Sequence, residues 1–505
     1  MMDDREKSDG RVLPVKLPNN AQGGAAEAVE GRRPAKGNAT GETRSGPSAG
    51  QSALSELGRV RRVATKDKEA RFTALLHHVD VDRLRAAYWA LEPEAAPGVD
   101  GVTWADYGQD LEENLRDLHA RVHRGAYRAR PSRRVYIPKA DGRLRPLGVA
   151  SLEDKIVQRA LVEVLNAVYE ADFLGFSYGF RPGRSPHHAL DALAAGIAEK
   201  KVNWVLDADF RDYFSSLDHC WLERFVEHRI ADRRVLRLIQ KWLAAGVIEN
   251  GSWAAFDEGV PQGASVSPLL GNIYLHYVFD LWAHQWRTRH ARGDVVIVRF
   301  ADDFVVGFEY RDDAERFWAD LRERLAKFSL ELNAEKTRLI EFGRFAAERR
   351  AARGLGKPET FRFLGFTHAC GKTRKAGRFK LKRTTDSKRV RAKLRALKGD
   401  IERRRHQPIP EQGRWLANVL RGHYQYYAVP ENIEALRAFR RQAVWHWLRA
   451  LRRRSQRTTV TWERMSRLEA RWLPPPRILH PWPERRFDAR TQGRREQPTR
   501  LRSSW

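Results

Sequence analysis

Residues 294–308, DVVIVRFADDFVVGF, constrain the fold of this chain more than any other stretch. Val295–Phe300 and Phe304–Phe308 are apolar runs rich in β-branched and aromatic residues, which predicts two strands. Their short connection predicts a tight hairpin with Asp302 and Asp303 at its tip. Neighbouring carboxylates repel each other and are costly to bury. A solvated turn is the plain alternative, because Asp is common in turns.

A third acid, Asp209, follows a short apolar run at residues 203–206 (NWVL) that predicts another strand. A carboxylate at the end of that strand could face the hairpin tip across a sheet. Asp209 and Asp302 could then bridge two Mg²⁺ ions, which lie about 3.5–4 Å apart in two-metal sites of phosphoryl transfer. Mg²⁺ prefers a few carboxylates together with phosphates and water. Cations between the acids would explain why the acids gather.

The charge of the chain indicates a polyanionic partner, which we interpret as nucleic acid. There are 93 Lys and Arg against 64 Asp and Glu, a formal charge of +29, and residues 381–505 hold 32 basic against 11 acidic residues. Cys220 and Cys370 form no CxxC pair, which argues against a disulfide framework or structural zinc. Because no apolar run could span a membrane and the N-terminus lacks an apolar targeting segment, we expect a cytoplasmic protein without a membrane span.

Local patterns predict how the chain is organised. Residues 1–52 are rich in Gly, Ala, Ser, Pro and Arg, without apolar periodicity, which predicts a disordered leader. Helical spacing appears at residues 71–91 and 219–246, and residues 132–149 predict a β-hairpin with a turn at Asp141-Gly142. The mixed order of these elements predicts an α+β fold with helical additions.

Five motifs in sequence order carry a resemblance to a known family: VLDADFRDYFSSLDH, EGVPQGASVSPLLGNIYLH, VRFADDFVVGF, LNAEKTRLIEF and FRFLGF. They resemble the palm motifs of reverse transcriptases, most closely those of bacterial group II intron reverse transcriptase/maturases. Three earlier motifs are similar to the fingers of that family: APGVDGVTW, YIPKADGRLRPLGV and FSYGFRPGRSPHHAL. The resemblance extends over most of the chain after the leader.

The resemblance implies an α+β right-hand polymerase. Residues 53–380 would form the fingers and palm, and residues 381–470 a helical, basic thumb or maturase domain X that binds RNA. Residues 471–505 would form a basic Pro- and Arg-rich tail, a candidate DNA-binding segment.

The resemblance also implies an active site. Asp209 and Asp302 would be metal ligands, with Asp303 as an adjacent acid that binds weakly or supports the site. The backbone carbonyl of Phe210 would complete the coordination of Mg²⁺. Lys336 would protonate the departing pyrophosphate.

The nucleotide-binding residues are implied in the same way. Phe214 would be the bulky gate that excludes a ribose 2′-hydroxyl, and Gln262 and Gly263 would lie against the incoming nucleotide. Three finger residues would grip the triphosphate: Lys139, Arg143 and Arg145. Phe300 stands where many reverse transcriptases have Tyr, which removes a hydroxyl but keeps the ring.

Each of these residues has a plainer interpretation when it is taken alone. Phe214 could be a core aromatic residue, Lys336 a surface lysine and Gly263 a turn glycine. Arg143 and Arg145 could belong to a solvated strand face. The register of the motifs favours the functional roles.

The basic C-terminal region is predicted to bind RNA, because basic side chains neutralise phosphates and aromatic rings can stack on unpaired bases. The plain alternative for aromatic residues such as Trp445 and Trp447 is a place in the helical core. The candidate RNA-binding residues are Arg421, His423, Arg440, Arg441, Arg452, Arg453 and Arg454.

The function implied is RNA-directed DNA synthesis from dNTPs on group II intron RNA during retrohoming, primed by target DNA, together with help in splicing. No His- and Cys-rich HNH endonuclease segment is visible, so we expect the primer to come from elsewhere, for example a nascent strand at a replication fork. The expected location is the bacterial cytoplasm, at the nucleoid when acting on DNA. The sequence leaves the oligomeric state open.

Two alternatives remain at this stage. One is a splicing-only, RNA-binding maturase whose polymerase site is vestigial. The other is a domesticated reverse transcriptase in phage defence or CRISPR adaptation.

Overall fold

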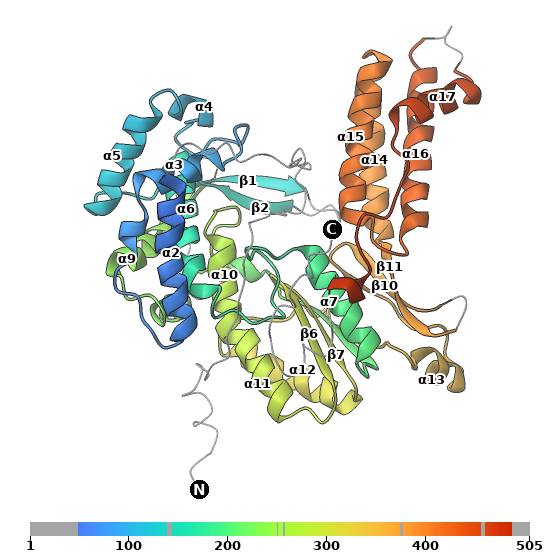
Figure 1. The fold of residues 1–505 in the computed structure, drawn as a ribbon, viewed down its shortest axis with the longest axis horizontal. Helices are drawn as coiled ribbons and strands as arrows, with labels where there is room; N and C mark the ends of the chain where they lie inside the picture. The colour runs from blue at the N-terminus through green and yellow to red at the C-terminus, as the bar shows by residue number, and fades with distance from the viewer. Residues whose placement is uncertain are drawn as a thin grey trace.

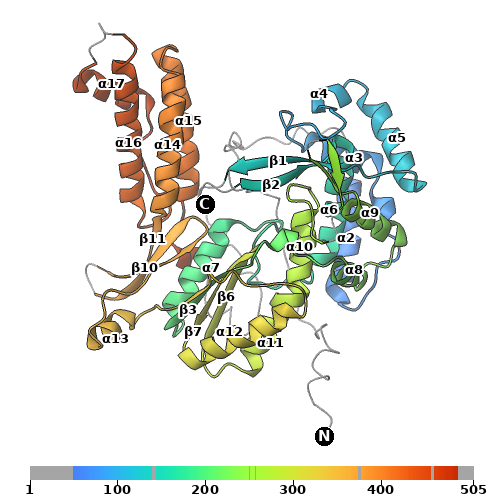
Figure 2. The same ribbon diagram turned by 180° about the vertical axis from the view of Figure 1, so that it is seen from behind.

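The computed structural model describes residues 49–138, 144–249, 251–255, 258–373, 377–455 and 460–486. Helices and strands are mixed along the chain and form three separate sheets (Figures 1 and 2). The predicted α+β class is therefore confirmed. Within these residues, no helix is long and apolar enough to cross a membrane.

A group of short helices stands at one end of the molecule (Figure 1). Its members are α2 (Ala49–Lys66), the 3-10 helix η1 (Leu76–His78), α3 (Val81–Trp89), α4 (Trp104–Tyr107) and α5 (Leu111–His123). The helical spacing noted over residues 71–91 corresponds to two separate elements, η1 and α3. The side chain of Asp80 accepts a hydrogen bond from the backbone N–H of Arg83 (2.7 Å) and so starts a new helix.

A four-stranded sheet beside these helices has the order β2-β1-β4-β5, and we call it the hairpin sheet. Its strands are β1 (Ser132–Pro138), β2 (Leu144–Val149), β4 (Val247–Glu249) and β5 (Ser252–Ala254). β1 and β2 pair antiparallel, which confirms the predicted hairpin. The turn predicted at Asp141 and Gly142 lies outside the described residues.

The central sheet has the order β6-β7-β3-β8, and its neighbouring strands are all antiparallel. Its strands are β3 (Trp204–Asp209), β6 (Val295–Phe300), β7 (Asp303–Phe308) and β8 (Arg338–Glu341). Val205 and Val305 point into one hydrophobic core, and Leu206 and Val306 point into another. Because the sheet is buried on both faces, its strands are almost continuously apolar.

Helices cover both faces of the central sheet. On the face of Val205 lies α7 (Pro186–Glu199). On the face of Leu206 lies α12 (Arg311–Ala326). That face also packs against one continuous run made of α10 (Ser267–Leu275), a π-helix (His276–Asp280) and α11 (Leu281–Arg289).

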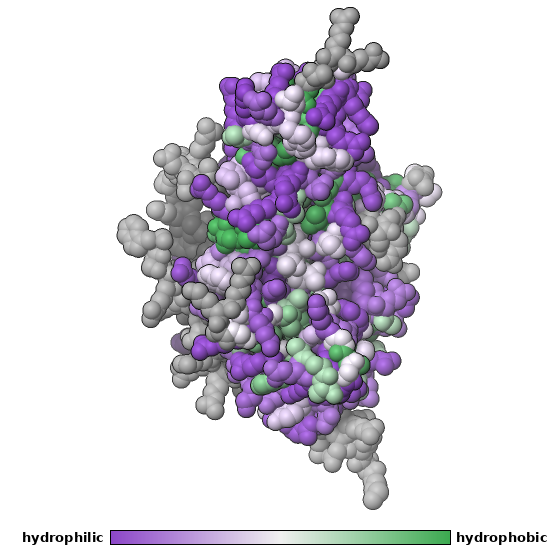
Figure 3. Space-filling view, turned by 90° about the vertical axis from the view of Figure 1, so that its right-hand side faces the viewer, coloured by the Kyte–Doolittle hydropathy of each residue, from purple (hydrophilic) through white to green (hydrophobic). Residues whose placement is uncertain are grey.

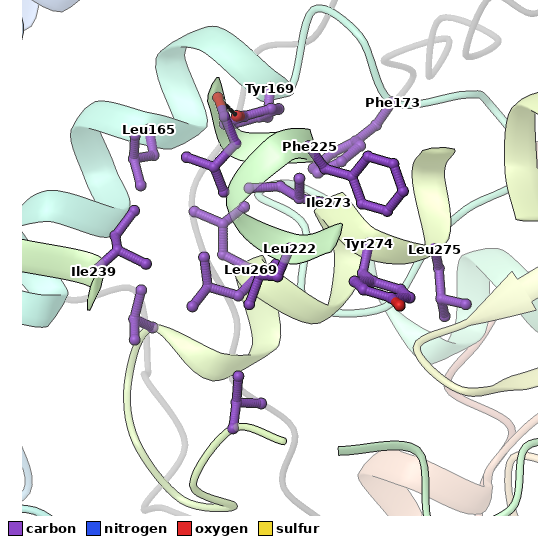
Figure 4. Packing of buried hydrophobic residues seen from close by; sticks show 14 of the residues in the cluster. Leu165, Tyr169, Phe173, Leu222, Phe225, Ile239, Leu269, Ile273, Tyr274 and Leu275 are labelled. Carbon is purple, nitrogen blue, oxygen red and sulfur yellow. Dashed lines mark hydrogen bonds between the residues drawn. The ribbon is translucent and has the colours of Figure 1, made fainter. Parts of the chain in front are cut away.

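The largest hydrophobic core surrounds α10. Three further helices pack around it: α6 (Leu152–Tyr169), α8 (His219–Glu227) and α9 (Arg233–Ala244). Figure 4 shows Leu165 of α6, Leu222 of α8 and Ile273 of α10 in this packing. The core therefore joins the helices beside the hairpin sheet to the helices beneath the central sheet.

A third sheet leads into the C-terminal helices. Its strands β9 (Phe361–Phe363), β10 (Phe366–Lys372) and β11 (Phe379–Thr385) follow the short helix α13 (Ala346–Ala352). A buried ion pair between Asp191 of α7 and Arg383 of β11 (2.6 Å) fastens this sheet to α7. We call the helices that follow the C-terminal helical unit: α14 (Ser387–Arg403), α15 (Ile409–Tyr427), α16 (Ile433–Arg452) and α17 (Trp462–Trp472).

After α17 the chain turns back along the C-terminal helical unit, and we call residues 473–486 the strap. Arg440 of α16 donates hydrogen bonds to two strap carbonyls (3.1 and 3.2 Å). His480 of the strap stacks on His187 of α7, with ring centroids 3.8 Å apart. The strap ends in α18 (Pro483–Arg486), which lies beside α7 (Figure 1). The C-terminal helical unit is thus held by β11, by the strap and by Tyr426 of α15, whose backbone carbonyl lies 2.8 Å from His187 Nε2 and whose hydroxyl donates to the carbonyl oxygen of Leu364 (2.9 Å).

Candidate active site

Three carboxylates meet where β3 ends and the β6–β7 hairpin turns. In the antiparallel register Asp209 lies opposite Asp303. Because side chains alternate along a strand, Asp209 and Asp303 share the face of Val205 and Val305. Asp302 precedes Asp303 at the hairpin tip. The expectation that Asp209 faces the hairpin is confirmed, and we call Asp209, Asp302 and Asp303 the acidic cluster.

The hairpin tip is as tight as predicted. Phe300 pairs with Asp303, so Ala301 and Asp302 form a two-residue loop. Ala301 has φ +56, a left-handed conformation in which hairpin loops usually have Gly, Asn or Asp. Such strain costs on the order of 1–3 kcal/mol and persists only where the surroundings enforce it.

Lys336 joins the acidic cluster from the loop before β8. Its ammonium group is bonded to the carboxylate of Asp209. The backbone places the loop, because Asn333 N–H donates to the carbonyl oxygen of Asp209 (2.8 Å). Burial lowers the pKa of Lys336, but the bond to Asp209 and the charges of the other two acids raise it by more, so the net shift is upward. The lysine is thus a charged donor, 55% exposed, next to the acids.

The acidic cluster offers hard oxygen donors, the type that Mg²⁺ prefers. Phe210, whose carbonyl was predicted as a further ligand, is buried and forms an antiparallel bridge with Leu332. Within the described part of the chain, no group of three or more His, Cys, Asp or Glu side chains is arranged as a metal centre.

Asp207 is a carboxylate near the site that the sequence analysis did not single out. It lies two residues before Asp209 on the same strand face, 3.3 Å from Arg338. Burial raises the pKa of Asp207 to about 6, against the opposing effect of the Arg338 hydrogen bond. Its signal in the sequence was the alternation DAD at the end of an apolar run, which places both acids on one face.

Phe214 follows Asp209 by five residues and belongs to the 3-10 helix η2 (Tyr213–Ser215). It is half-buried, and its carbonyl oxygen accepts a hydrogen bond from Val260 N–H (2.7 Å). A Cβ atom added to Gly271 of α10 would lie 3.1 Å from the Phe214 ring, so glycine there leaves room for the ring. The ring is therefore neither fully in the core nor free on the surface.

The loop that contains Gln262 and Gly263 is docked on β2. Gly148 N–H donates to the carbonyl oxygen of Gln262 (2.7 Å), and Gly263 has φ +107. Gly263 is exposed and Gln262 half-buried, beside a small polar recess. This recess is lined by Arg134, Pro146, Ser215, Glu258, Gly259, Val260 and Gln262.

Of the three predicted finger residues, only Arg145 can be placed. It is exposed on β2, opposite Ile137 of β1. Lys139 and Arg143 lie outside the described residues.

Two aromatic rings lie beside the hairpin tip. Phe300 is half-buried and contacts Phe180, with ring centroids 6.3 Å apart. Phe180 has φ +56, rare for a bulky side chain. Phe300 was expected at this place from the sequence, whereas Phe180 was not.

The candidate RNA-binding residues of the C-terminal helical unit divide into two groups. Five of them line its outside: Arg421, Arg441, Arg452 and Arg453 are exposed, and Arg454 is half-buried. Trp445 is also exposed and lies against Arg449, whose guanidinium carbon is 4.5 Å from the centre of the ring. Figure 3, which faces this side of the molecule, shows a mostly hydrophilic surface there.

His423 and Arg440 are both engaged by contacts within the unit, so the structure does not support their predicted RNA contacts. His423 is buried, its ring stacks on Phe439 with centroids 3.8 Å apart, and burial lowers its pKa to about 3. A neutral ring inside the core cannot neutralise a phosphate. Arg440 is bonded to Glu469 and to the strap. Trp447 is likewise buried in the core.

Comparisons with known proteins agree with this geometry. Residues 137–368 match the family model described as reverse transcriptase (RNA-dependent DNA polymerase). The chain is 36% identical to protein YkfC of Escherichia coli over 274 residues, 48% of this chain and 72% of that protein. It is 32% identical to the group II intron-encoded protein LtrA of Lactococcus lactis over 222 residues, 44% of this chain and 37% of LtrA. It is 30% identical over 91 residues to nuclear intron maturase 1, mitochondrial, of Arabidopsis thaliana, 18% of this chain and 12% of that protein.

A strand-end acid opposite an acidic hairpin, on a sheet backed by helices, is an arrangement suited to nucleotidyl transfer. The chain belongs to the reverse transcriptase family of RNA-dependent DNA polymerases. Within that family it groups with the group II intron reverse transcriptase/maturases.

Proposed function

We propose that this chain copies group II intron RNA into DNA during retrohoming and assists the splicing of that RNA. In this proposal the central sheet is the palm of a right-hand polymerase. The hairpin sheet and the N-terminal helices are the fingers, and the C-terminal helical unit is the thumb or maturase domain X. The observation that carries the proposal is the register of Asp209 opposite Asp303, with Lys336 bonded to Asp209.

The reaction is the attack of a primer 3′-hydroxyl on the α-phosphorus of a dNTP. A bond forms between that oxygen and phosphorus, the hydroxyl proton is released to solvent, and the bond from phosphorus to the pyrophosphate oxygen breaks. Lys336 holds a proton beside Asp209 and would give it to the departing pyrophosphate. The protein's contribution is mainly positioning and electrostatic stabilisation.

Reverse transcriptases as a family depend on divalent metal ions, and we propose Mg²⁺ for this chain. Asp209 and Asp302 would hold it, with Asp303 and the carbonyl of Phe210 in support. Bound divalent ions would neutralise the negative charge that develops on the phosphate oxygens.

Selection of the nucleotide is assigned to the surroundings of Phe214. The half-buried ring faces Gly271 on one side and is fixed through its own carbonyl by Val260. A rigid ring at this place would clash with a 2′-hydroxyl but leave room for a deoxyribose. Gln262 and the exposed Arg145 would contact the incoming dNTP, together with Lys139 and Arg143.

The RNA partner is assigned to the outside of the C-terminal helical unit. Exposed arginines there supply charge for phosphates, and Trp445 offers a ring for an unpaired base. The primer would be the 3′ end of target DNA. The rest of the charge surplus fits a protein that holds RNA and DNA together.

A primer-extension assay tests the proposal. Purified protein is given an RNA template, an annealed DNA primer, dNTPs and Mg²⁺, beside Asp302→Ala and the matched control Asp312→Ala, an exposed acid on α12. Extension by wild type and Asp312→Ala, its loss in Asp302→Ala, and its loss with a chelator are expected. If wild type is inert on several templates but still accelerates splicing of its RNA, the polymerase proposal fails and an RNA-binding splicing cofactor replaces it.

A further inference from the structure

Arg299 is fully buried in β6, three residues before Asp302. A guanidinium group has five N–H donors, and each of the five in Arg299 has an acceptor. The acceptors are the two carboxylate oxygens of Asp280 (2.7 and 2.5 Å), Asn272 Oδ1 (3.0 Å), Ser177 Oγ (2.7 Å) and the carbonyl oxygen of Ala301 (2.9 Å).

Arg299 acts from beneath the sheet. It alternates with Phe300 along β6 and so lies on the face of Ile297, opposite to the face of the acidic cluster. Asp280 ends the π-helix and Asn272 belongs to α10, so two helical segments hold the guanidinium from below.

One of the five bonds reaches the hairpin tip directly. The carbonyl oxygen of Ala301 belongs to the peptide unit that joins Ala301 to Asp302. Ala301 has φ +56, which an alanine adopts only when its surroundings enforce it. The bond from Arg299 to this carbonyl is a contact that can enforce it.

The same network braces the tip from the side. Asn272 Nδ2 donates to the carbonyl oxygen of Gly179 (2.6 Å). A Cβ atom at Gly179 would lie 2.3 Å from Ala301 N, so only glycine lets this backbone approach the tip so closely. Arg299 also exchanges backbone hydrogen bonds with this segment, donating to Phe176 and accepting from Tyr178 (2.9 and 2.8 Å).

We propose that Arg299 is a positioning residue that sets the place of Asp302 and Asp303 by holding the peptide unit between Ala301 and Asp302. Asp280 and Asn272 support this role by fixing the guanidinium. The inference rests on the proposed function of the acidic cluster. A buried ion pair is weak evidence for stability, because well-packed apolar residues often replace one at no cost. The effect of Arg299 on the geometry of the hairpin tip therefore explains better than stability why a charged residue is buried here.

The test uses the full chain in the primer-extension assay with three variants. Arg299→Lys keeps a charge for Asp280 but cannot reach all the acceptors. Asn272→Ala leaves the ion pair intact and removes the brace on Gly179. Arg229→Lys is the matched control, because Arg229 is also buried and forms an ion pair with a carboxylate (Asp172, 3.1 Å), while its side-chain hydrogen bonds go to the backbone of residues 64–68.

Four quantities are measured: the melting temperature, the Kd for primer–template, the KM for dNTP, and kcat as a function of Mg²⁺ concentration. We expect Arg299→Lys to lower kcat by about 10- to 100-fold, the cost of a small misplacement of reacting groups. Half-maximal activity should need more Mg²⁺, while the Kd for primer–template stays near that of wild type. Asn272→Ala should change the same quantities in the same direction by less, and Arg229→Lys should not change the Mg²⁺ dependence.

The inference is overturned if folded Arg299→Lys and Asn272→Ala keep the wild-type kcat and Mg²⁺ dependence. It is also overturned if the loss of kcat in these two variants is fully explained by a smaller fraction of folded protein, the kind of loss that Arg229→Lys measures. If Arg299→Lys does not fold, the result for Asn272→Ala alone decides whether the inference holds. If the wild-type protein is itself inactive, the proposed function is contradicted. Comparing wild type with Asp302→Ala in the same assay distinguishes that outcome from a failure of positioning.

Discussion

The ammonium group of Lys336 is bonded to the carboxylate of Asp209, the strand-end acid that lies opposite Asp303. The pair joins the end of β3 to the loop before β8, which lies far from it in the sequence. Because Lys336 is more than half exposed and Asp209 is not, the lysine has room to turn toward a substrate while the acid stays on the sheet.

Lys336→Ala should lower kcat for a single nucleotide addition by about 10²-fold or more, the usual contribution of a positioned proton donor. Lys336→Arg should retain part of the charge effect. The measurement is single-turnover extension at saturating dNTP, with Lys327→Ala, another exposed lysine, as the control. An unchanged kcat in Lys336→Ala would leave this lysine with no part in proton transfer.

Phe214→Ala should let ribonucleotides in. Removing the ring opens the space that a 2′-hydroxyl needs, and pocket changes of this kind are worth about 10- to 200-fold in discrimination. The ratio of kcat/KM for a ribonucleotide to that for the matching deoxynucleotide should rise accordingly. Tyr213→Phe keeps the neighbouring ring and should not alter the ratio. A constant ratio in Phe214→Ala would mean that the ring only fills space.

Replacing Arg421, Arg441 and Arg453 by Gln should weaken RNA binding by the C-terminal helical unit. If each arginine neutralises one phosphate, the slope of log K against log salt should become shallower by about 0.7 to 0.9 per residue. The triple replacement of Arg311, Arg316 and Arg322 on α12 removes the same charge. Equal effects of the two triple variants would point to a general charge effect and contradict a specific RNA surface.

His423 gives the protein a dependence on pH. The folded pKa of about 3 lies below the unfolded value of 6.5, so the unfolded state binds more protons between these values and stability falls as pH drops below 6.5. At pH 5 the loss amounts to about 2 kcal/mol. His423→Phe keeps a ring against Phe439 and should flatten the decline in denaturation experiments from pH 7 to pH 5. It should also leave RNA affinity intact, and a loss of affinity would restore His423 to the RNA-binding set.

The acidic hairpin was predictable because its signals are local. The apolar runs predict the strands, and the short connection predicts the turn. The order of the motifs predicts that Asp209 lies near Asp302 and Asp303. The start of α6 was equally readable, since Ser151 caps that helix by accepting from Asp154 N–H. Asp80 carried the same kind of signal, but a continuous apolar spacing across residues 71–91 hid the break.

The contacts of buried polar groups could not be predicted in this way. Arg299 meets side chains from three other segments, and only the fold brings these together. His423 looked like a cationic residue among tyrosines, although it lies next to apolar positions such as Leu420 and Tyr424 on one helix face. Before α18 the strap has no periodicity, because its prolines prevent a regular element, so its path along the C-terminal helical unit was not visible in the sequence.

The strap has a consequence for how long the enzyme stays on its template. A body joined to its neighbour through one connection can swing, whereas each further connection holds it more firmly. His187 and His480 stack at one of these connections, and His187 also contacts the backbone of Tyr426 in α15. Cutting the chain at Leu473 would leave the acidic cluster untouched and yet remove the strap's share of this hold, so each nucleotide would still be added at the normal speed but fewer would be added before the product falls off.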